Sequence, residues 1–142
     1  MSDKIVTTSA KQTRARHHVA LLGRETGGQL SMRVTDTRPG DGTPLHLHRD
    51  QAETFHVVRG RFRFQIGDEE VSGGPGFTAH IPKGTPHCFT YLDDDAPGQL
   101  ISVLTPGIHD GFIEEVPIAQ ENGLKGPALA ELAKRHGVEI LR

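Results

Sequence analysis

Two stretches of sequence together decide the fold of this chain. The first is Gly40-Asp-Gly-Thr-Pro-Leu-His46-Leu-His48-Arg-Asp-Gln-Ala-Glu53-Thr-Phe-His-Val-Val-Arg-Gly60, and the second is Gly76-Phe-Thr-Ala-His-Ile-Pro82-Lys-Gly84-Thr-Pro-His87. His46 and His48 are two residues apart, so on a strand both side chains point to the same face. Glu53 follows after enough chain for a turn, and His87 comes from a separate, later hairpin. Three imidazoles and one carboxylate at these spacings on neighbouring strands predict a divalent-metal site.

Both stretches resemble the two sequence motifs of the cupin superfamily, G(X)5HXH(X)4E(X)6G and G(X)5PXG(X)2H(X)3N. Every specified position fits except the last, where Tyr91 replaces the usual Asn. A Thr-Pro-Gly step at 105–107 and a helical tail make the chain similar to small cupins related to bacterial quercetinases. The resemblance implies an antiparallel β-barrel in which His46, His48, Glu53 and His87 bind one metal ion.

Turn residues divide the chain into short segments, as expected for an all-β barrel or jelly roll. Glycine and proline together make up 26 of the 142 residues. We predict strands at 17–22, 29–37, 44–48, 53–59, 61–66, 69–72, 77–81, 86–92 and 98–105, a short helix over 110–115 and a clearer helix over 127–137. Residues 1–142 are expected to form one domain, with a barrel core over about 17–105 and a helical tail over about 107–137.

Composition narrows the possible partners and compartment. The net charge of −2 gives no basic surface for nucleic acid, and no apolar run is long enough for a membrane span. A single cysteine, Cys88, excludes an intramolecular disulfide framework, and the N-terminus lacks the pattern of a signal peptide. We therefore expect a cytoplasmic protein that binds a small molecule and neither nucleic acid nor membrane.

Alternation along the strands indicates which side chains face the barrel interior. The candidate pocket residues are aromatic and share inner faces with the ligands: Phe55, Phe64, Phe89 and Tyr91. Tyr91 could offer its phenol to a substrate or fill the core. The other histidines are predicted to be outward-facing or surface residues: His17, His18, His56, His80, His109 and His136.

The proposed ligand set leaves two open positions on a six-coordinate ion and suits Fe, Mn, Ni, Co, Zn or Cu. The first hypothesis is a metal-dependent dioxygenase that cleaves a small enolisable or hydroxyketone-type substrate, with Glu53 also serving as a general base. Alternatives are a non-catalytic metal- or ligand-binding barrel and a metal-dependent isomerase or lyase. Because cupins commonly pair through outer strands, we also expect a homodimer.

Overall fold

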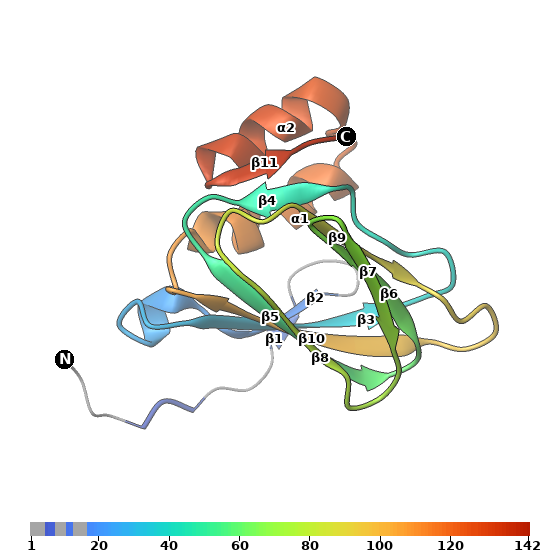
Figure 1. The fold of residues 1–142 in the computed structure, drawn as a ribbon. Helices are drawn as coiled ribbons and strands as arrows, with labels where there is room; N and C mark the ends of the chain where they lie inside the picture. Colours follow the sequence, from blue (N-terminus) through green and yellow to red (C-terminus); the bar gives the residue numbers. More distant parts are fainter. Residues whose placement is uncertain (1–4, 8–10, 13–16) are drawn as a thin grey trace.

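The computed structural model describes residues 5–7, 11–12 and 17–142, which fold into two antiparallel sheets with two helices near the C-terminus (Figure 1). In the described part of the chain the first sheet contains, in spatial order, β1 (Lys11–Gln12), β2 (His17–Leu21), β3 (Ser31–Thr37), β10 (Gly98–Thr105), β5 (Ala52–Arg59) and β8 (Thr78–Ile81). The second contains β11 (Val138–Ile140), β4 (His46–His48), β9 (His87–Tyr91), β6 (Phe62–Ile66) and β7 (Glu69–Gly73). The predicted barrel with a C-terminal helical segment is confirmed.

The core between the sheets is aromatic and follows the predicted alternation. On β5, Phe55 and Val57 are buried and His56 is exposed. On β6, Phe62 and Phe64 are fully buried, and the adjacent arginines point to solvent. These side chains form one cluster with Ile81, Tyr91 and Leu100, so residues from both sheets hold the barrel closed.

Glycines at the turns adopt the left-handed backbone conformation that the hairpins need. Gly60 lies between β5 and β6 with φ of 88°, and Gly84 lies before β9 with φ of 79°. A side chain is strained at such φ values. At Gly60 a Cβ atom would also lie 2.5 Å from the Tyr91 ring. This glycine therefore also leaves room for Tyr91, which stands where the family motif has Asn.

Helix α1 (Asp110–Glu121) is longer than the predicted 110–115 because it continues through Pro117. A proline inside a helix removes a hydrogen bond and is unfavourable by about 3 kcal/mol. Burial of Ile113 and Val116 on the same helix offsets that cost, and Ile113 packs with Val19, Leu22 and Leu104 of the barrel. Tertiary packing therefore sets the end of this helix.

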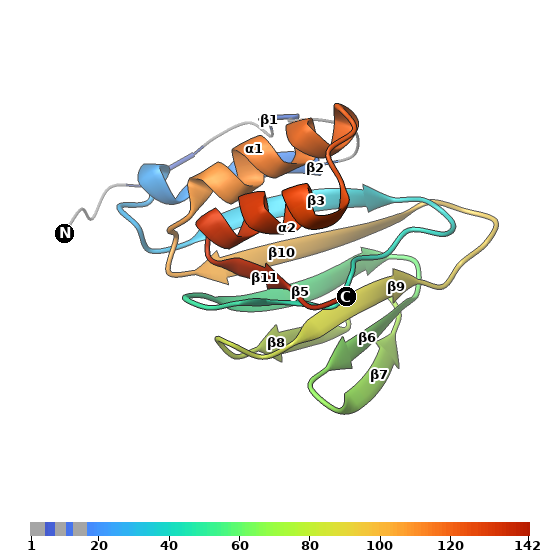
Figure 2. The ribbon, with the colours of Figure 1, turned by 90° about the horizontal axis from the view of Figure 1, so that it is seen from above.

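Helix α2 (Gly126–Arg135) packs against α1 and leads into β11, which was not predicted. Strand β11 pairs with β4, placing Val138 opposite His48 and Ile140 opposite His46. Figure 1 shows this last strand running beside β4, and Figures 1 and 2 show both helices on the same side of the barrel. The C-terminal segment thus completes the sheet that carries three of the predicted ligands.

Two short elements lie in the N-terminal part of the chain. A 3-10 helix, η1, spans Gly23–Glu25, and its backbone N–H groups at Gly23 and Arg24 donate to the carboxylate of Asp110. Strand β1 lies before the first predicted strand and pairs with β2. No helix in the described residues is both long and apolar enough to cross a membrane.

Candidate metal centre

The four predicted ligands come together between the two sheets. His46 and His48 lie on β4, His87 faces His46 from β9, and Glu53 enters from β5 of the opposite sheet. One ligand atom from each side chain lies within 4.8 Å of those from the other three. Glu53, His48 and His87 are at most 2% exposed, and His46 is half-buried.

Backbone carbonyls fix the orientation of two of the imidazoles. His46 Nδ1 lies 2.8 Å from the carbonyl oxygen of Pro44, and His87 Nδ1 lies 2.9 Å from that of Thr85. A carbonyl can only accept, so each Nδ1 carries the hydrogen. In the neutral rings Nε2 therefore presents its lone pair, which is the arrangement that metal-binding histidines commonly have.

The carboxylate of Glu53 faces these lone pairs. Its Oε1 lies 3.0 Å from His87 Nε2 and 3.2 Å from His48 Nε2. A carboxylate oxygen opposite neutral acceptor nitrogens is favourable only when a proton or a cation sits between them. Moreover, neither ring nitrogen of His48 has a hydrogen-bond partner among the described residues, although both are buried.

These observations fit a divalent metal ion. Metal bonds to imidazole nitrogen and carboxylate oxygen are about 2.0–2.2 Å long, so ligands on opposite sides of one ion are about 4 Å apart. The 4.8 Å span of the cluster is close to that diameter. An ion would satisfy the unpaired ring of His48 and relieve the contact between Glu53 and the two imidazoles.

The ionisation of the cluster without metal follows from its burial and its charges. Burial raises the pKa of Glu53, but the imidazoles of His48 and His87, together with the Arg33 guanidinium, outweigh burial and hold that pKa well below its usual range. Burial, together with the nearby His87, lowers the pKa of His46 to about 4. At neutral pH Glu53 is thus a carboxylate and His46 is neutral, which are the forms that bind metal.

Two polar residues that the sequence analysis did not select hold the other oxygen of Glu53. Ser102 Oγ on β10 donates a hydrogen bond to Glu53 Oε2, and Arg33 on β3 places a guanidinium nitrogen 3.6 Å from the same oxygen. The signal for Ser102 is in the sequence, because it interrupts the inward-facing pair Leu100 and Leu104. Arg33 has a similar signal, since Ser31, Arg33, Thr35 and Thr37 alternate along one strand.

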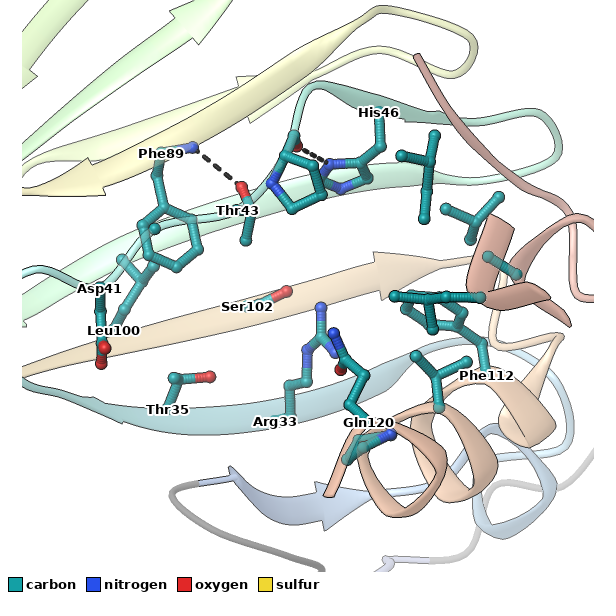
Figure 3. Close-up of a pocket in the computed structure, with 18 of the residues that line it drawn as sticks. Arg33, Thr35, Asp41, Thr43, His46, Phe89, Leu100, Ser102, Phe112 and Gln120 are labelled. Atoms are coloured by element: carbon teal, nitrogen blue, oxygen red, sulfur yellow. Dashed lines mark hydrogen bonds between the residues drawn. The ribbon is translucent and has the colours of Figure 1, made fainter. Parts of the chain in front are cut away.

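A cavity of about 440 Å³ opens onto the cluster at His46 (Figure 3). Arg33 and Ser102 also line it, so the groups around Glu53 face the same space. Its remaining wall comes from the barrel, both helices and β11, including Phe112, Val116, Leu129 and Ile140.

The structure separates the four aromatic residues predicted for the pocket. Phe55 and Phe89 line the cavity, whereas Phe64 and Tyr91 do not and instead lie in the aromatic core. The Tyr91 hydroxyl donates to the carbonyl oxygen of Ala96 at 2.8 Å, in the loop before β10. Tyr91 therefore has a packing role at this place in the fold, which is one of its two predicted alternatives.

The remaining histidines are partly as predicted. His56 and His80 are exposed on the outer face of the barrel, where each contacts a threonine. His109 and His136 are only half-exposed, and their Nε2 atoms lie 2.9 Å from carboxylate oxygens of Asp50 and Glu115 respectively. Their partners are distant in sequence, which is why the sequence did not reveal them. The side chains of His17 and His18 lie outside the described part.

Comparison with known proteins agrees with this geometry. The family model described as "Cupin domain" matches residues 33–104, half of the chain. Quercetin 2,3-dioxygenase of Bacillus subtilis (strain 168) is 27% identical over 96 residues, which cover 68% of this chain. The chain spans only 28% of the length of that curated relative.

Several solved structures have the same fold. A sugar phosphate isomerase from a cupin superfamily, from Silicibacter pomeroyi, is 27% identical with a TM-score of 0.53, covering 63% of this chain and 59% of that one. A predicted oxalate decarboxylase from Thermotoga maritima is 15% identical with a TM-score of 0.58, covering 71% and 93%, and shows the fold alone. The family match, the two facing sheets and the cluster of motif residues lead to one conclusion: this chain belongs to the cupin family.

Proposed function

We propose that this chain is a metal-dependent cupin enzyme, a dioxygenase that cleaves a small enolisable or hydroxyketone-type substrate. The observation that carries the proposal is the buried cluster of His46, His48, Glu53 and His87 beside a cavity of about 440 Å³. The similarity to quercetin 2,3-dioxygenase supports the choice of reaction. A cavity of this size suits a small substrate.

His46, His48, Glu53 and His87 would hold one divalent ion, and the ion would supply dioxygen activation if it is redox-active or Lewis-acid polarisation of a substrate oxygen if it is not. The chain's own residues position the reactants. The carbonyls of Pro44 and Thr85 orient two imidazoles, and Ser102 and Arg33 orient Glu53. Phe55, Phe89 and Phe112 line the cavity and exclude water from part of it.

The role of Glu53 as a general base is a separate part of the proposal. Its low pKa in the metal-free protein makes it a weak base, because the imidazoles of His48 and His87 and the Arg33 guanidinium stabilise the carboxylate. The variant Glu53→Gln tests this role. Full turnover by a variant that retains its metal would show that no proton passes through Glu53.

A metal-dependent isomerase or lyase is the second candidate. The similarity to the sugar phosphate isomerase favours it, and the same ligand set would then provide a Lewis acid only. A non-catalytic binding barrel is the third possibility. The three candidates differ in their need for metal and for dioxygen.

Metal content and oxygen uptake distinguish these candidates. Protein purified without chelator is analysed by plasma mass spectrometry as wild type, as His48→Ala and as the control His56→Ala, which changes an exposed histidine on the outer face. We expect near-stoichiometric redox-active metal in wild type and control and loss of it in His48→Ala, with oxygen consumption on enolisable substrates. Zinc that iron does not displace would favour the isomerase or lyase. Absence of metal from all three would contradict an enzyme of either metal-dependent kind.

A further inference from the structure

The inner face of β3 is polar, unlike the apolar inner faces of β5 and β6. Arg33, Thr35 and Thr37 alternate along this strand and line the cavity. The Thr37 side chain is buried, and its hydroxyl has no hydrogen-bond partner among the described residues. Because burial of an unpaired polar group is unfavourable, the Thr37 hydroxyl on this polar face indicates a site for a polar ligand.

Arg33 is the charged member of this row. Its side chain is 16% exposed, and Figure 3 shows it extending from β3 into the pocket. Its guanidinium carbon lies 5.9 Å from the ring centroid of Phe112, so α1 places an aromatic ring over the cation. The 3.6 Å separation from Glu53 is longer than a hydrogen bond, and therefore this contact does not occupy the planar fork of N–H donors.

We infer that Arg33 binds the carboxylate of the substrate, while the metal centre takes a second oxygen of the same molecule. The position of Arg33 sets the distance between these two groups. Its guanidinium contacts one oxygen of Glu53, and the other oxygen of Glu53 faces the imidazoles. A carboxylate on Arg33 therefore lies one or two carbons from the oxygen at the metal, as in a 2-oxo, 2-hydroxy or 3-oxo acid. The part of this inference that places a substrate oxygen at the metal rests on the proposed function, and the part that concerns Arg33 does not.

The charges around the cavity favour a carboxylate over a phosphate. Among the described residues that line it, Arg33 is the only lysine or arginine, and Asp41 and Glu121 carry negative charge on its wall. One guanidinium matches the geometry and the single charge of a carboxylate. A phosphate dianion would leave one charge unmatched in a cavity that already contains two carboxylates.

The rest of the wall suits a short hydrocarbon group. Leu100, Val116, Leu129 and Ile140 also line the cavity. A branched aliphatic chain would bury apolar surface against them without leaving polar atoms unpaired. The compound 4-methyl-2-oxopentanoate has a carboxylate, a second oxygen on the adjacent carbon and a branched aliphatic chain, and is therefore a suitable probe.

Titration calorimetry with 4-methyl-2-oxopentanoate, its methyl ester and inorganic phosphate tests the inference. The proteins are wild type, Arg33→Gln and the control Arg63→Gln, which changes an arginine on the solvent side of β6. Loss of a charge-assisted pair predicts about 10- to 100-fold weaker binding of the acid to Arg33→Gln. We expect the control to bind like wild type and the ester to bind equally to all three. Equal affinity of wild type and Arg33→Gln for the acid would overturn the inference, as would Arg33-dependent binding of phosphate that is tighter than that of the acid.

Metal content and thermal unfolding are measured on the same samples, so that the two proposals fail separately. Wild type without metal contradicts the proposed function, but the Arg33 dependence is still measured on that protein, because the guanidinium belongs to the chain itself. If Arg33→Gln loses its metal or its fold, Arg33→Lys is compared instead. This variant keeps the charge and loses the planar fork, so a folded, metal-containing Arg33→Lys should bind the acid more weakly than wild type. Wild-type affinity in Arg33→Lys would then overturn the inference.

Discussion

Ser102 lines the cavity and orients Glu53. Its hydroxyl donates to Glu53 Oε2, leaving Oε1 toward His48 and His87. Groups that orient metal ligands in this way commonly contribute 10- to 100-fold to metal affinity. The position also explains why a serine stands among the buried leucines of β10.

The variant Ser102→Ala is therefore expected to bind metal about 10-fold more weakly than wild type, with little change in fold. Competition with a chromogenic chelator measures the affinity. Ser72→Ala is the matched control, because Ser72 is exposed on β7. Equal affinity in all three proteins would show that Ser102 does not position Glu53.

His46 makes the stability of the metal-free protein depend on pH. Its pKa is about 4 in the folded chain and about 6.5 in the unfolded chain, so between these values only the unfolded chain binds the proton. Stability therefore falls as the pH decreases from about 6.5 to about 4, and the contribution of His46 is about 3 kcal/mol. Glu53 adds to the loss at lower pH, because its depressed folded pKa stabilises the fold above the unfolded value and that stabilisation disappears as pH falls through the folded pKa.

Urea unfolding of chelator-treated protein at pH 7.5 and pH 5 measures this effect. His46→Gln should lose much of the difference between the two pH values, whereas His56→Gln, which changes an exposed histidine, should retain it. The same pH dependence in His46→Gln and wild type would contradict the assignment of this loss of stability to His46.

Strand β11, near the C-terminus, pairs with β4 and supports it. Val138 is 2% exposed, lies opposite His48 and lines the cavity. Without β11, β4 would have an unpaired edge next to two of the candidate metal ligands. The final segment of the chain is thus part of the site's support.

Val138→Ala removes two buried methyl groups and should lower the free energy of unfolding by about 2 kcal/mol. We expect weaker metal binding as well, since the backbone of His48 loses part of its support. Glu139→Ala is the control, because its half-exposed side chain alternates to the other side of β11. Chemical unfolding and chelator competition measure the two effects, and a stable Val138→Ala variant with weakened metal binding would separate them.

Metal binding would be linked to folding of the whole molecule, because the four candidate ligands come from three strands in two sheets. A ligand at 100 times its dissociation constant stabilises the folded state by about 2.7 kcal/mol. For a chain of this size that corresponds to a Tm increase of roughly 8 °C. Calorimetry with metal and with chelator should show this increase in wild type and not in His48→Ala. An equal increase in the variant would place the metal elsewhere.

The homodimer remains a prediction for the assembled molecule. The edge strands are β1 and β8 in the first described sheet and β11 and β7 in the second, and such strands have backbone groups available for pairing. Light scattering after size-exclusion chromatography should give about twice the mass of 15.5 kDa. A monomer over the working range of concentration would contradict it.

The sequence by itself determined the barrel and the four residues of the candidate metal centre, because these depend on local signals. Alternation places His46 and His48 on one face, and glycines at positions such as Gly60 mark the turns. The ligand spacings matched the family motifs, and the fold then brought Glu53 and His87 to the same point.

Only the tertiary structure decided which residues surround that centre. Arg33, Ser102 and Val138 meet Glu53 and β4 through contacts between segments far apart in the chain, and no local period specifies such contacts. The same reason separates Phe55 and Phe89, which line the cavity, from Phe64 and Tyr91, which lie in the core. Alternation gives the side of a strand, but the position along the barrel axis depends on packing of the two sheets and the helices.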